Sequence, residues 1–326
     1  MNRSALLRCG LLIALAPHCA AYAQDPFTID RPVRLIVPFA AGNTLDSSAR
    51  VVAEAFLRIT GQPLIVDNKP GGAGSIAAHL GASAAPDGYT VLMASSGMLA
   101  INPHAFSRLN YDPVNDFKAV TGFVGSPMVM AVNKNVPADN LQGFIDWTLK
   151  NPGKVSYASF TAGNPSHFAG MILNKRTGMD MAHVPYNGTS PAVQNLIGEQ
   201  IQAAFVNSLA VAPYLAEGRV KILATTSPKR RPNLPNVPTF TELGYPELEI
   251  LLWTTLMVPC NTPEAPVRAL HAAFVKALAD KEVESKLNNM DFVTMPSTPE
   301  ETTRFIASES ARWKEAVRLS GFKATE

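Results

Sequence analysis

Short apolar runs alternate with longer amphipathic segments along most of the chain. The runs are almost continuously apolar, which is typical of parallel strands buried on both faces of a sheet. We predict strands at residues 34–39, 63–68, 90–96, 127–133, 155–159, 181–186, 201–207 and 220–227. Because helical segments lie between these runs, the pattern predicts an α/β fold with mostly parallel sheets.

The amphipathic segments carry clear helix signals. Leu45, Ala49, Val52 and Phe56 share one face of a predicted helix, and Gly61 is well placed to end it. Further helices are predicted at residues 167–178, 190–200, 264–280 and 299–321. The segment around Lys229, Arg230 and Arg231 is rich in proline and is predicted to form a solvated turn.

The first 23 residues have the pattern of a secretory signal peptide. Arg3 and Arg8 flank a short apolar run, and Ala21-Tyr22-Ala23 is an A-x-A cleavage site. A membrane anchor is the alternative, but the apolar run is well short of the roughly 20 residues that span a bilayer. We therefore expect a periplasmic protein whose signal peptide, residues 1–23, is cleaved near Ala23.

Charge and cysteine content narrow the class of protein. Loss of Arg3 and Arg8 with the signal peptide would reduce the formal net charge from +2 to zero. A neutral chain disfavours a nucleic-acid partner, because phosphates demand a basic surface. Cys260 would be the remaining cysteine, so no disulfide within the chain is expected.

Small polar residues gather at four predicted strand-to-helix junctions, at residues 40–46, 95–97, 160–167 and 187–190. In open α/β sheets ligands bind beyond the carboxyl ends of the strands, so we expect these loops to face one cleft. They carry hydroxyl, amide and backbone N–H groups but no lysine or arginine. This chemistry suits a singly charged carboxylate better than a polyphosphate. Ordinary caps and turns are the alternative interpretation.

Enzyme and cofactor motifs are weak or missing. Gly72–Ala77 matches GxGxxA but does not follow a strand directly, so a glycine-rich helix start facing the cleft is the better interpretation. The chain has no GxSxG, and its histidines lack metal-ligand spacing. His167, after Ser166, is the most plausible member of a catalytic triad, although a cleft hydrogen-bond donor or a cap fits it better. We expect no catalysis, no cofactor and no metal.

Six motifs resemble, in order and spacing, the Bug receptors, which are the extracytoplasmic substrate-binding proteins of tripartite tricarboxylate transporters. The resemblance covers nearly all of the mature chain. It implies a two-domain periplasmic-binding-protein fold that closes on an organic anion, commonly a carboxylate, in a cleft between the lobes. The motifs are RPVRLIVPFAAGNTLDSSAR, VDNKPGGAGSIAA, PDGYTVLMASS, YASFTAGNPSHFAG, AHVPYNGTSPAVQNLIGEQIQAAFVN and LPNVPTFTELGYPELE.

The resemblance also implies the domain organisation and the ligand loops. The chain leaves a first domain, residues 24–127 plus 249–326, to build a second domain at 128–248. SPMVMAVN and LEILLWTTLMVP are then the crossover strands. The loops of the resemblance, with the serines at 95–96, give this ligand-binding set: Phe39, Gly42, Asn43, Thr44, Asp46, Ser95, Ser96, Thr161, Gly163, Asn164, Ser166, His167, Tyr186, Asn187, Gly188 and Asn207.

The expected function is capture of a small organic anion for a tripartite tricarboxylate-type permease, by a monomer. A secreted α/β hydrolase of small esters or amides, and a receptor that presents its ligand to a sensor protein, are the alternatives. Asn43 replaces a glycine usual in the family, Leu45 a small polar residue, and Val206 a frequent aspartate. With Asp46 engaged at a helix start, these departures predict a monocarboxylate with an apolar or aromatic body.

Overall fold

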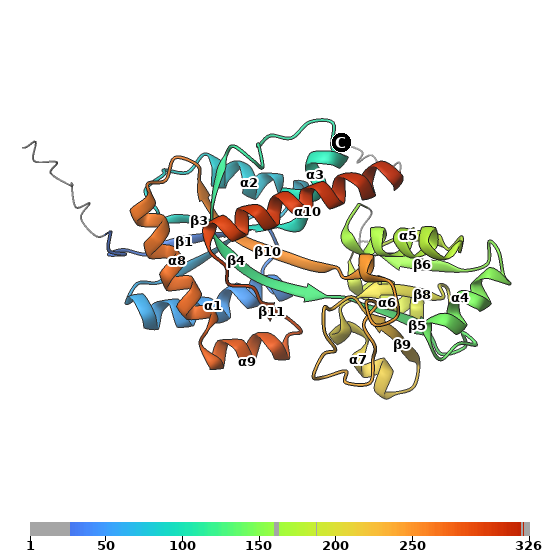
Figure 1. Ribbon diagram of the computed structural model, residues 1–326. Coiled ribbons are helices and arrows are strands. Elements are labelled where there is room, and N and C mark those ends of the chain that lie inside the picture. Colours follow the sequence, from blue (N-terminus) through green and yellow to red (C-terminus); the bar gives the residue numbers. More distant parts are fainter. Residues whose placement is uncertain (1–26, 160–162, 187, 321, 323–326) are drawn as a thin grey trace, which may run out of the picture.

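Two β-sheets joined by long strands form the core of the protein, for which a computed structural model describes residues 27–159, 163–186, 188–320 and 322 (Figure 1). The predicted signal peptide, Thr161 and Asn187 lie outside the described residues. The first sheet has the strand order β11-β4-β10-β3-β1-β2. Its strands are β1 (Val33–Val37), β2 (Leu64–Asn68), β3 (Thr90–Ser95), β4 (Phe117–Pro127), β10 (Leu251–Pro259) and β11 (Val293–Thr294).

The second sheet has the order β7-β6-β8-β5-β9. Each sheet with its helices is called a lobe below. The second sheet's strands are β5 (Val129–Asn133), β6 (Ser156–Ser159), β7 (Ala182–Pro185), β8 (Ala203–Val206) and β9 (Val220–Thr225).

Helices cover both faces of both sheets (Figure 1). Those of the first lobe are α1 (Thr44–Thr60), α2 (Ser75–Ala82), α3 (Asn102–Ala105), α8 (Glu264–Leu278), α9 (Lys281–Asn289) and α10 (Pro299–Ser320). Those of the second lobe are α4 (Leu141–Leu149), α5 (Pro165–Thr177), α6 (Thr189–Ile197) and α7 (Ser208–Ala216). Three short turns of helix complete the chain: η1 (Gly72–Gly74), η2 (Gly97–Ile101) and η3 (Pro246–Leu248).

The expected α/β fold is confirmed, but the expectation of mostly parallel sheets was wrong. β1 pairs parallel with β2 and β3, and β6 pairs parallel with β7 and β8. The remaining pairs are antiparallel: β10 with β3 and β4, β11 with β4, and β5 with β8 and β9. The strands that carry the chain between the lobes run against their neighbours, so both sheets are mixed.

β4 and β10 are the connection between the lobes. They pair from Leu251↔Pro127 to Pro259↔Phe117, and Met128 alone separates β4 from β5. Figure 1 shows this antiparallel ribbon running from one lobe to the other. Two adjacent extended strands can bend together with little loss of hydrogen bonding, which makes them suitable as a hinge.

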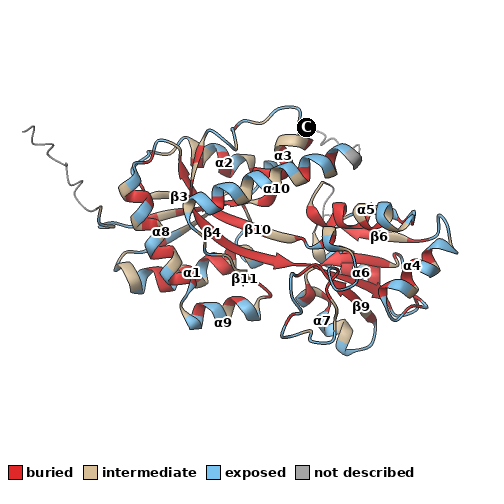
Figure 2. Cartoon of the chain, in the orientation of Figure 1, coloured by how far each residue is buried: buried red, intermediate tan, exposed pale blue. Residues whose placement is uncertain are grey.

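Alternate residues of the central strands face different cores, which explains their continuously apolar sequence. In β1, Val33, Leu35 and Val37 pack under α1, α8 and α9, whereas Ile36 faces the opposite core. In β5, Met130 belongs to the same core as the buried residues of α4 and α5. Figure 2 shows the resulting buried strands between helices whose outer faces are exposed. One core is continuous from the first lobe into the second.

Candidate functional site

A cavity of about 880 Å³ lies between the lobes. Described residues of all four predicted polar loops reach it, so the prediction of one common cleft is confirmed. The glycine-rich segment before α2 reaches it as well, through Ala73. The predicted residues that line it are Phe39, Asn43, Thr44, Ser95, Ser96, Gly163, Asn164, Gly188 and Asn207.

Four helices begin at this cavity. Asn43, Asn164, Gly188 and Asn207 are the N-caps of α1, α5, α6 and α7, and each of them lines the cavity. The three asparagine side chains accept hydrogen bonds from the first backbone N–H groups of their helices. Helix N-termini carry partial positive charge, so four of them create a site for an anion without a lysine or arginine.

In the first loop, Asp46 lies beneath the cavity surface and does not line it. Asp46 is 2% exposed and accepts hydrogen bonds from Gly42 N at 2.8 Å and Asn68 Nδ2 at 2.9 Å. Arg50 pairs with it at 3.0 Å. Burial raises the pKa of the Asp46 carboxyl, but the bonds from Arg50, Gly42 and Asn68 outweigh burial and lower it overall. The Asp46 carboxylate and the Gly42 N–H group are therefore hydrogen-bonded to each other and not to a ligand in the cavity.

The second loop is organised by Asn164. Its Oδ1 accepts hydrogen bonds from Ser166 N at 3.0 Å, His167 N at 3.2 Å and Ser166 Oγ at 2.7 Å. Its Nδ2 is buried and has no hydrogen-bond partner among the described residues. Ser166 is fully buried, and its hydroxyl bonds to Asn164 instead of lining the cavity. Asn164 thus offers a donor that a bound anion can satisfy.

Gly163 cannot be replaced without disturbing this loop. Its φ is +74°, and a Cβ would lie 2.3 Å from the ring of Phe322. Its N–H donates to His167 Nδ1 at 3.1 Å. Phe322, beyond the end of α10, therefore packs directly on the loop, and it also lines the cavity.

His167 lies behind the loop and stacks on His183, with ring centroids 3.7 Å apart. His183 Nε2 bonds to Ser159 Oγ at 2.7 Å. Burial lowers the pKa of each histidine, and for His183 the charge of His167 adds to this effect, so that both histidines have a pKa of about 4. Two neutral stacked imidazoles support the loop, and neither His167 nor Tyr186 lines the cavity among the described residues.

Several lining residues are aromatic or aliphatic and were missed by the sequence analysis. Trp253 of β10 donates its Nε1–H to Glu309 at 2.8 Å, and the same carboxylate accepts from Trp313 at 3.1 Å. Phe305 of α10 packs on Trp253 with ring centroids 5.1 Å apart. These contacts fix the indole in place. The other apolar lining residues that were missed are Ala105, Phe106, Leu252, Phe292 and Phe322.

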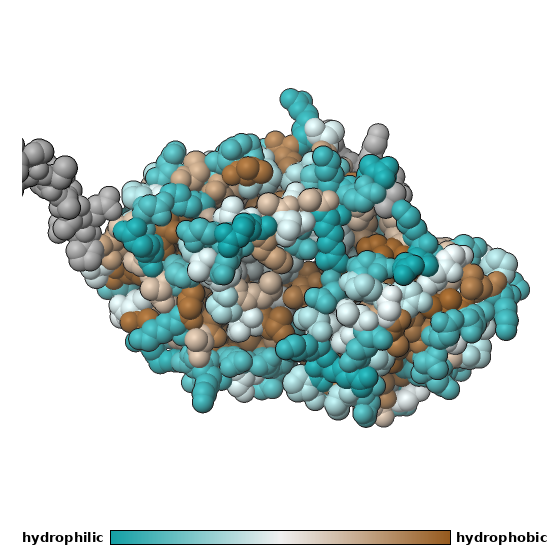
Figure 3. Space-filling model, viewed as in Figure 1, coloured by the Kyte–Doolittle hydropathy of each residue, from teal (hydrophilic) through white to brown (hydrophobic). Residues whose placement is uncertain are grey.

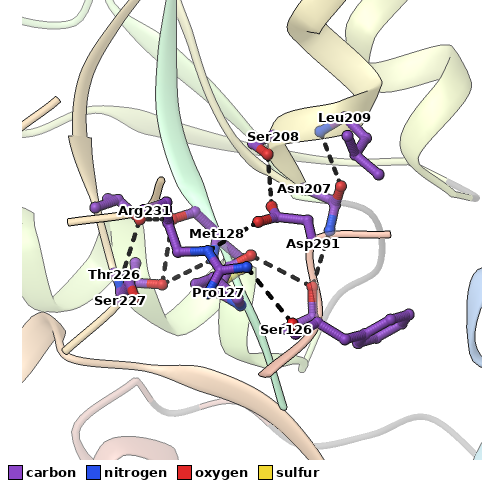
Figure 4. A network of polar contacts seen from close by, with 12 residues as sticks. Ser126, Pro127, Met128, Asn207, Ser208, Leu209, Thr226, Ser227, Arg231 and Asp291 are labelled. Atoms are coloured by element: carbon purple, nitrogen blue, oxygen red, sulfur yellow. Dashed lines mark hydrogen bonds and ion pairs between the residues drawn. The ribbon is translucent and has the colours of Figure 1, made fainter. Parts of the chain in front are cut away.

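A buried polar network joins the lobes beside the cavity (Figure 4). Asp291, in the turn before β11, pairs with Arg231 of the second lobe at 3.1 Å and accepts a hydrogen bond from Ser208 at 2.5 Å. Arg231 and Asp291 are 7% and 1% exposed, so the expected solvated turn was wrong for Arg231. Burial raises the pKa of the Asp291 carboxyl despite the bonds from Ser208 and Arg231.

The family model of the tripartite tricarboxylate transporter family receptor matches residues 48–322. BugT of Bordetella pertussis is 33% identical over 325 residues, which is 99% of each chain. The chain belongs to this receptor family. The resemblance seen in the sequence motifs is therefore confirmed over almost the whole protein.

Solved structures of related receptors share the fold. The R. palustris protein Rpa4515, described with adipate, is 29% identical, with a TM-score of 0.79 and coverage of 90% of this chain and 99% of that chain. MatC from Rhodopseudomonas palustris, described with bound malate, is 30% identical, with a TM-score of 0.73 and coverage of 89% and 99%. These relatives carry dicarboxylates within the architecture described here.

The positions that depart from the family pattern differ in their placement. Asn43 and Leu45 line the cavity, but Val206 is fully buried in the core under α6 and α7 and does not line it among the described residues. Elsewhere in the described part of this receptor, no group of three histidine, cysteine or acidic residues is placed to hold a metal. Within the same residues, no helix combines the length and the apolar character needed to span a bilayer.

Proposed function

We propose that the protein is a periplasmic solute-binding receptor whose lobes close over a small organic carboxylate. The convergence of the N-termini of α1, α5, α6 and α7 on one cavity carries this proposal. The buried donor of Asn164 supports it, because a carboxylate oxygen would satisfy that donor. The relatives described with adipate and malate support the same ligand class.

The proposed domains are residues 24–127 plus 249–326 and residues 128–248, with the β4–β10 ribbon between them. The strands of the first sheet all lie within the first proposed domain, and those of the second sheet all lie within the second, which supports this division. We place the ligand carboxylate at the loops that carry the predicted site residues, including Thr161 and Asn187. Membership of the receptor family supports delivery of the ligand to the membrane permease of a tripartite tricarboxylate-type transporter.

The proposed receptor is an exported monomer. Hydrophilic residues cover most of the face in Figure 3, and hydrophobic residues gather in narrower patches between them. The mature chain should begin at or near Gln24, which N-terminal sequencing of protein from the periplasm checks. Recovery of Met1 from the soluble cytosol would contradict export.

The proposed receptor does not turn its ligand over. Ser166 Oγ bonds to Asn164, and His167 Nδ1 accepts from Gly163, so these two side chains do not form a nucleophile–base pair. Mass spectrometry of small molecules released from gently purified protein tests the function. Release of a carboxylate in near-equal amount to protein is expected, whereas hydrolysis of added esters or amides would contradict the proposal.

A further inference from the structure

The cavity carries no formal charge among its described lining residues, which are apolar or polar and neutral. The undescribed residues of the adjoining loops are Phe160, Thr161, Ala162 and Asn187, and none of these is ionisable in the ordinary range. Lys323 and Glu326 follow the lining residue Phe322 in the sequence, and the charge of Lys323 is tested below by substitution. Among the described lining residues, a ligand group with a full charge therefore has only neutral hydrogen-bonding partners, chiefly the N–H groups and amides at the four helix starts and the hydroxyls of Ser95 and Ser96. This limits how many charges one ligand can bury.

An ammonium group on the ligand would find no carboxylate. Asp46 directly follows the lining residue Leu45 in the first loop. Its two carboxylate oxygens already contact Gly42, Arg50 and Asn68. Glu309, behind Trp253, accepts from two indole N–H groups and pairs with Arg312. Asp291, which precedes the lining residue Phe292, pairs with Arg231 and accepts a hydrogen bond from Ser208. All three carboxylates are committed, so an amino acid would leave its ammonium group unpaired.

Five lining residues form an apolar wall, defined as Ala105, Phe106, Leu252, Trp253 and Phe322. The polar lining residues on the same elements, Asn102 of α3 and Thr254 of β10, already donate their side-chain hydrogen bonds within the protein. The wall residues come from the end of α3 and the residue after it, from β10, and from Phe322 beyond the end of α10, and α10 contacts α3. A ligand that reaches from the helix starts to this wall places its body against aromatic and aliphatic groups. A second carboxylate at the wall would lose its water without gaining a hydrogen bond.

Resting on the proposed function, we infer that the ligand is a monocarboxylate with an aromatic or other apolar body and without an ammonium group. The carboxylate binds at the starts of α1 and α5, and the body lies on the apolar wall. This class differs from the dicarboxylates found with the related structures, in that it carries one charge instead of two. The cavity volume of about 880 Å³ leaves room for an aryl group.

Calorimetry with matched probes tests this inference. The probes are benzoate, phenylacetate and 3-phenylpropionate. Each comparison compound changes one property of the last probe: 3-(4-carboxyphenyl)propionate adds a carboxylate, phenylalanine adds an ammonium group, and 3-phenylpropanol removes the charge. Malate and adipate complete the set. We expect the tightest aryl monocarboxylate to bind at least tenfold more strongly than the added dicarboxylates, phenylalanine and 3-phenylpropanol.

Two variants of the wall sharpen the test. Phe106→Arg places a cation at the wall and should shift the preference toward 3-(4-carboxyphenyl)propionate by tenfold or more, whereas Phe106→Leu keeps the wall apolar and should keep the original ranking. Lys323→Ala, which removes the charge that follows Phe322 in the sequence, should also keep it.

The outcomes separate this inference from the proposed function. If folded protein binds a dicarboxylate, phenylalanine or the alcohol as tightly as the aryl monocarboxylates, this inference is wrong and the receptor function stands. If it binds no carboxylate of the set, this inference is wrong, and mass spectrometry of the small molecules released from purified protein decides the proposed function. A Phe106→Arg variant that folds and keeps the original preference would place the ligand body away from the wall and overturn the inference.

Discussion

The two polar atoms of the Asn164 side-chain amide have different roles. Oδ1 caps α5, and Nδ2 is the buried donor at the cavity. Asn164→Asp keeps an oxygen for the cap but removes the donor and adds a negative charge beside the anion. We expect ligand affinity to fall at least tenfold, because a charge-assisted hydrogen bond contributes about 1.5–3 kcal/mol.

Calorimetry measures this loss, and thermal unfolding should show that α5 keeps its cap. Ser166→Ala is the matched control, since its hydroxyl bonds to Asn164 and does not line the cavity. It should change affinity only slightly. Equal affinity in Asn164→Asp and in the unmodified protein would show that Asn164 is a cap and nothing more.

The stacked pair of His167 and His183 makes stability depend on pH. Each imidazole has a pKa of about 4 in the fold, against 6.5 for an unperturbed histidine, so the unfolded chain binds protons first as the pH falls. The stabilisation is present above pH 6.5 and is lost as the pH falls to about 4. Its size for His167 is on the order of 3 kcal/mol, from about 1.4 kcal/mol per pKa unit.

Denaturant unfolding at several pH values between 7.5 and 4.5 measures this loss. The double variant His167→Gln/His183→Gln should lose less stability across the range than the unmodified protein. His79→Gln, on the exposed side of α2, should follow the unmodified protein. Parallel curves for all three proteins would refute the assignment.

Among the elements, the turn between α9 and β11 joins the lobes through Asp291. Its φ of +60° suits Asn, so Asp291→Asn removes the charge without forcing the backbone. The Arg231 guanidinium would then be buried without its carboxylate, and we expect a loss of roughly 3–5 kcal/mol in the free energy of unfolding. Denaturant titration measures it.

A double-mutant cycle with Arg231→Met gives the control. The double variant should recover part of the loss, because it buries no unpaired charge. The single Asp291→Asn variant should also bind ligand more weakly, since the neighbours Phe292 and Asn207 line the cavity. An unchanged midpoint in Asp291→Asn would mean that this ion pair does not hold the lobes.

The secondary-structure elements also show which features of the site can be predicted from sequence and which cannot. The loops at α1, α5 and α6 were predicted because caps, glycines and strand ends are local signals. Trp253 and Phe106 were missed because an aromatic residue at a cavity has the same local pattern as one in a core. Arg231 and Asp291 lie 60 residues apart, so no local pattern predicts their ion pair. The antiparallel pairing of β4 and β10 likewise depends on the chain coming back from the second lobe to the first, which no local pattern shows.

At the scale of the whole molecule, the ribbon of β4 and β10 allows the lobes to close. A ligand held by helix starts from both lobes favours the closed state by its difference in affinity for the two states. Small-angle scattering with saturating 3-phenylpropionate should therefore give a smaller radius of gyration. Asn164→Asp at the same ligand concentration should show little change. A radius that stays constant in the unmodified protein would argue against closure.

The neutral lining of the cavity also governs how the protein responds to dissolved salt. Screening weakens attraction between formal charges over a Debye length of about 8 Å at 0.15 M, and the described lining residues present none to screen. The partial charges at helix starts act only at contact, inside a closed site. The fraction of receptor with bound ligand, at a given ligand concentration, should therefore stay nearly constant between dilute and concentrated saline. The receptor would then capture its ligand equally well at low and at high salt.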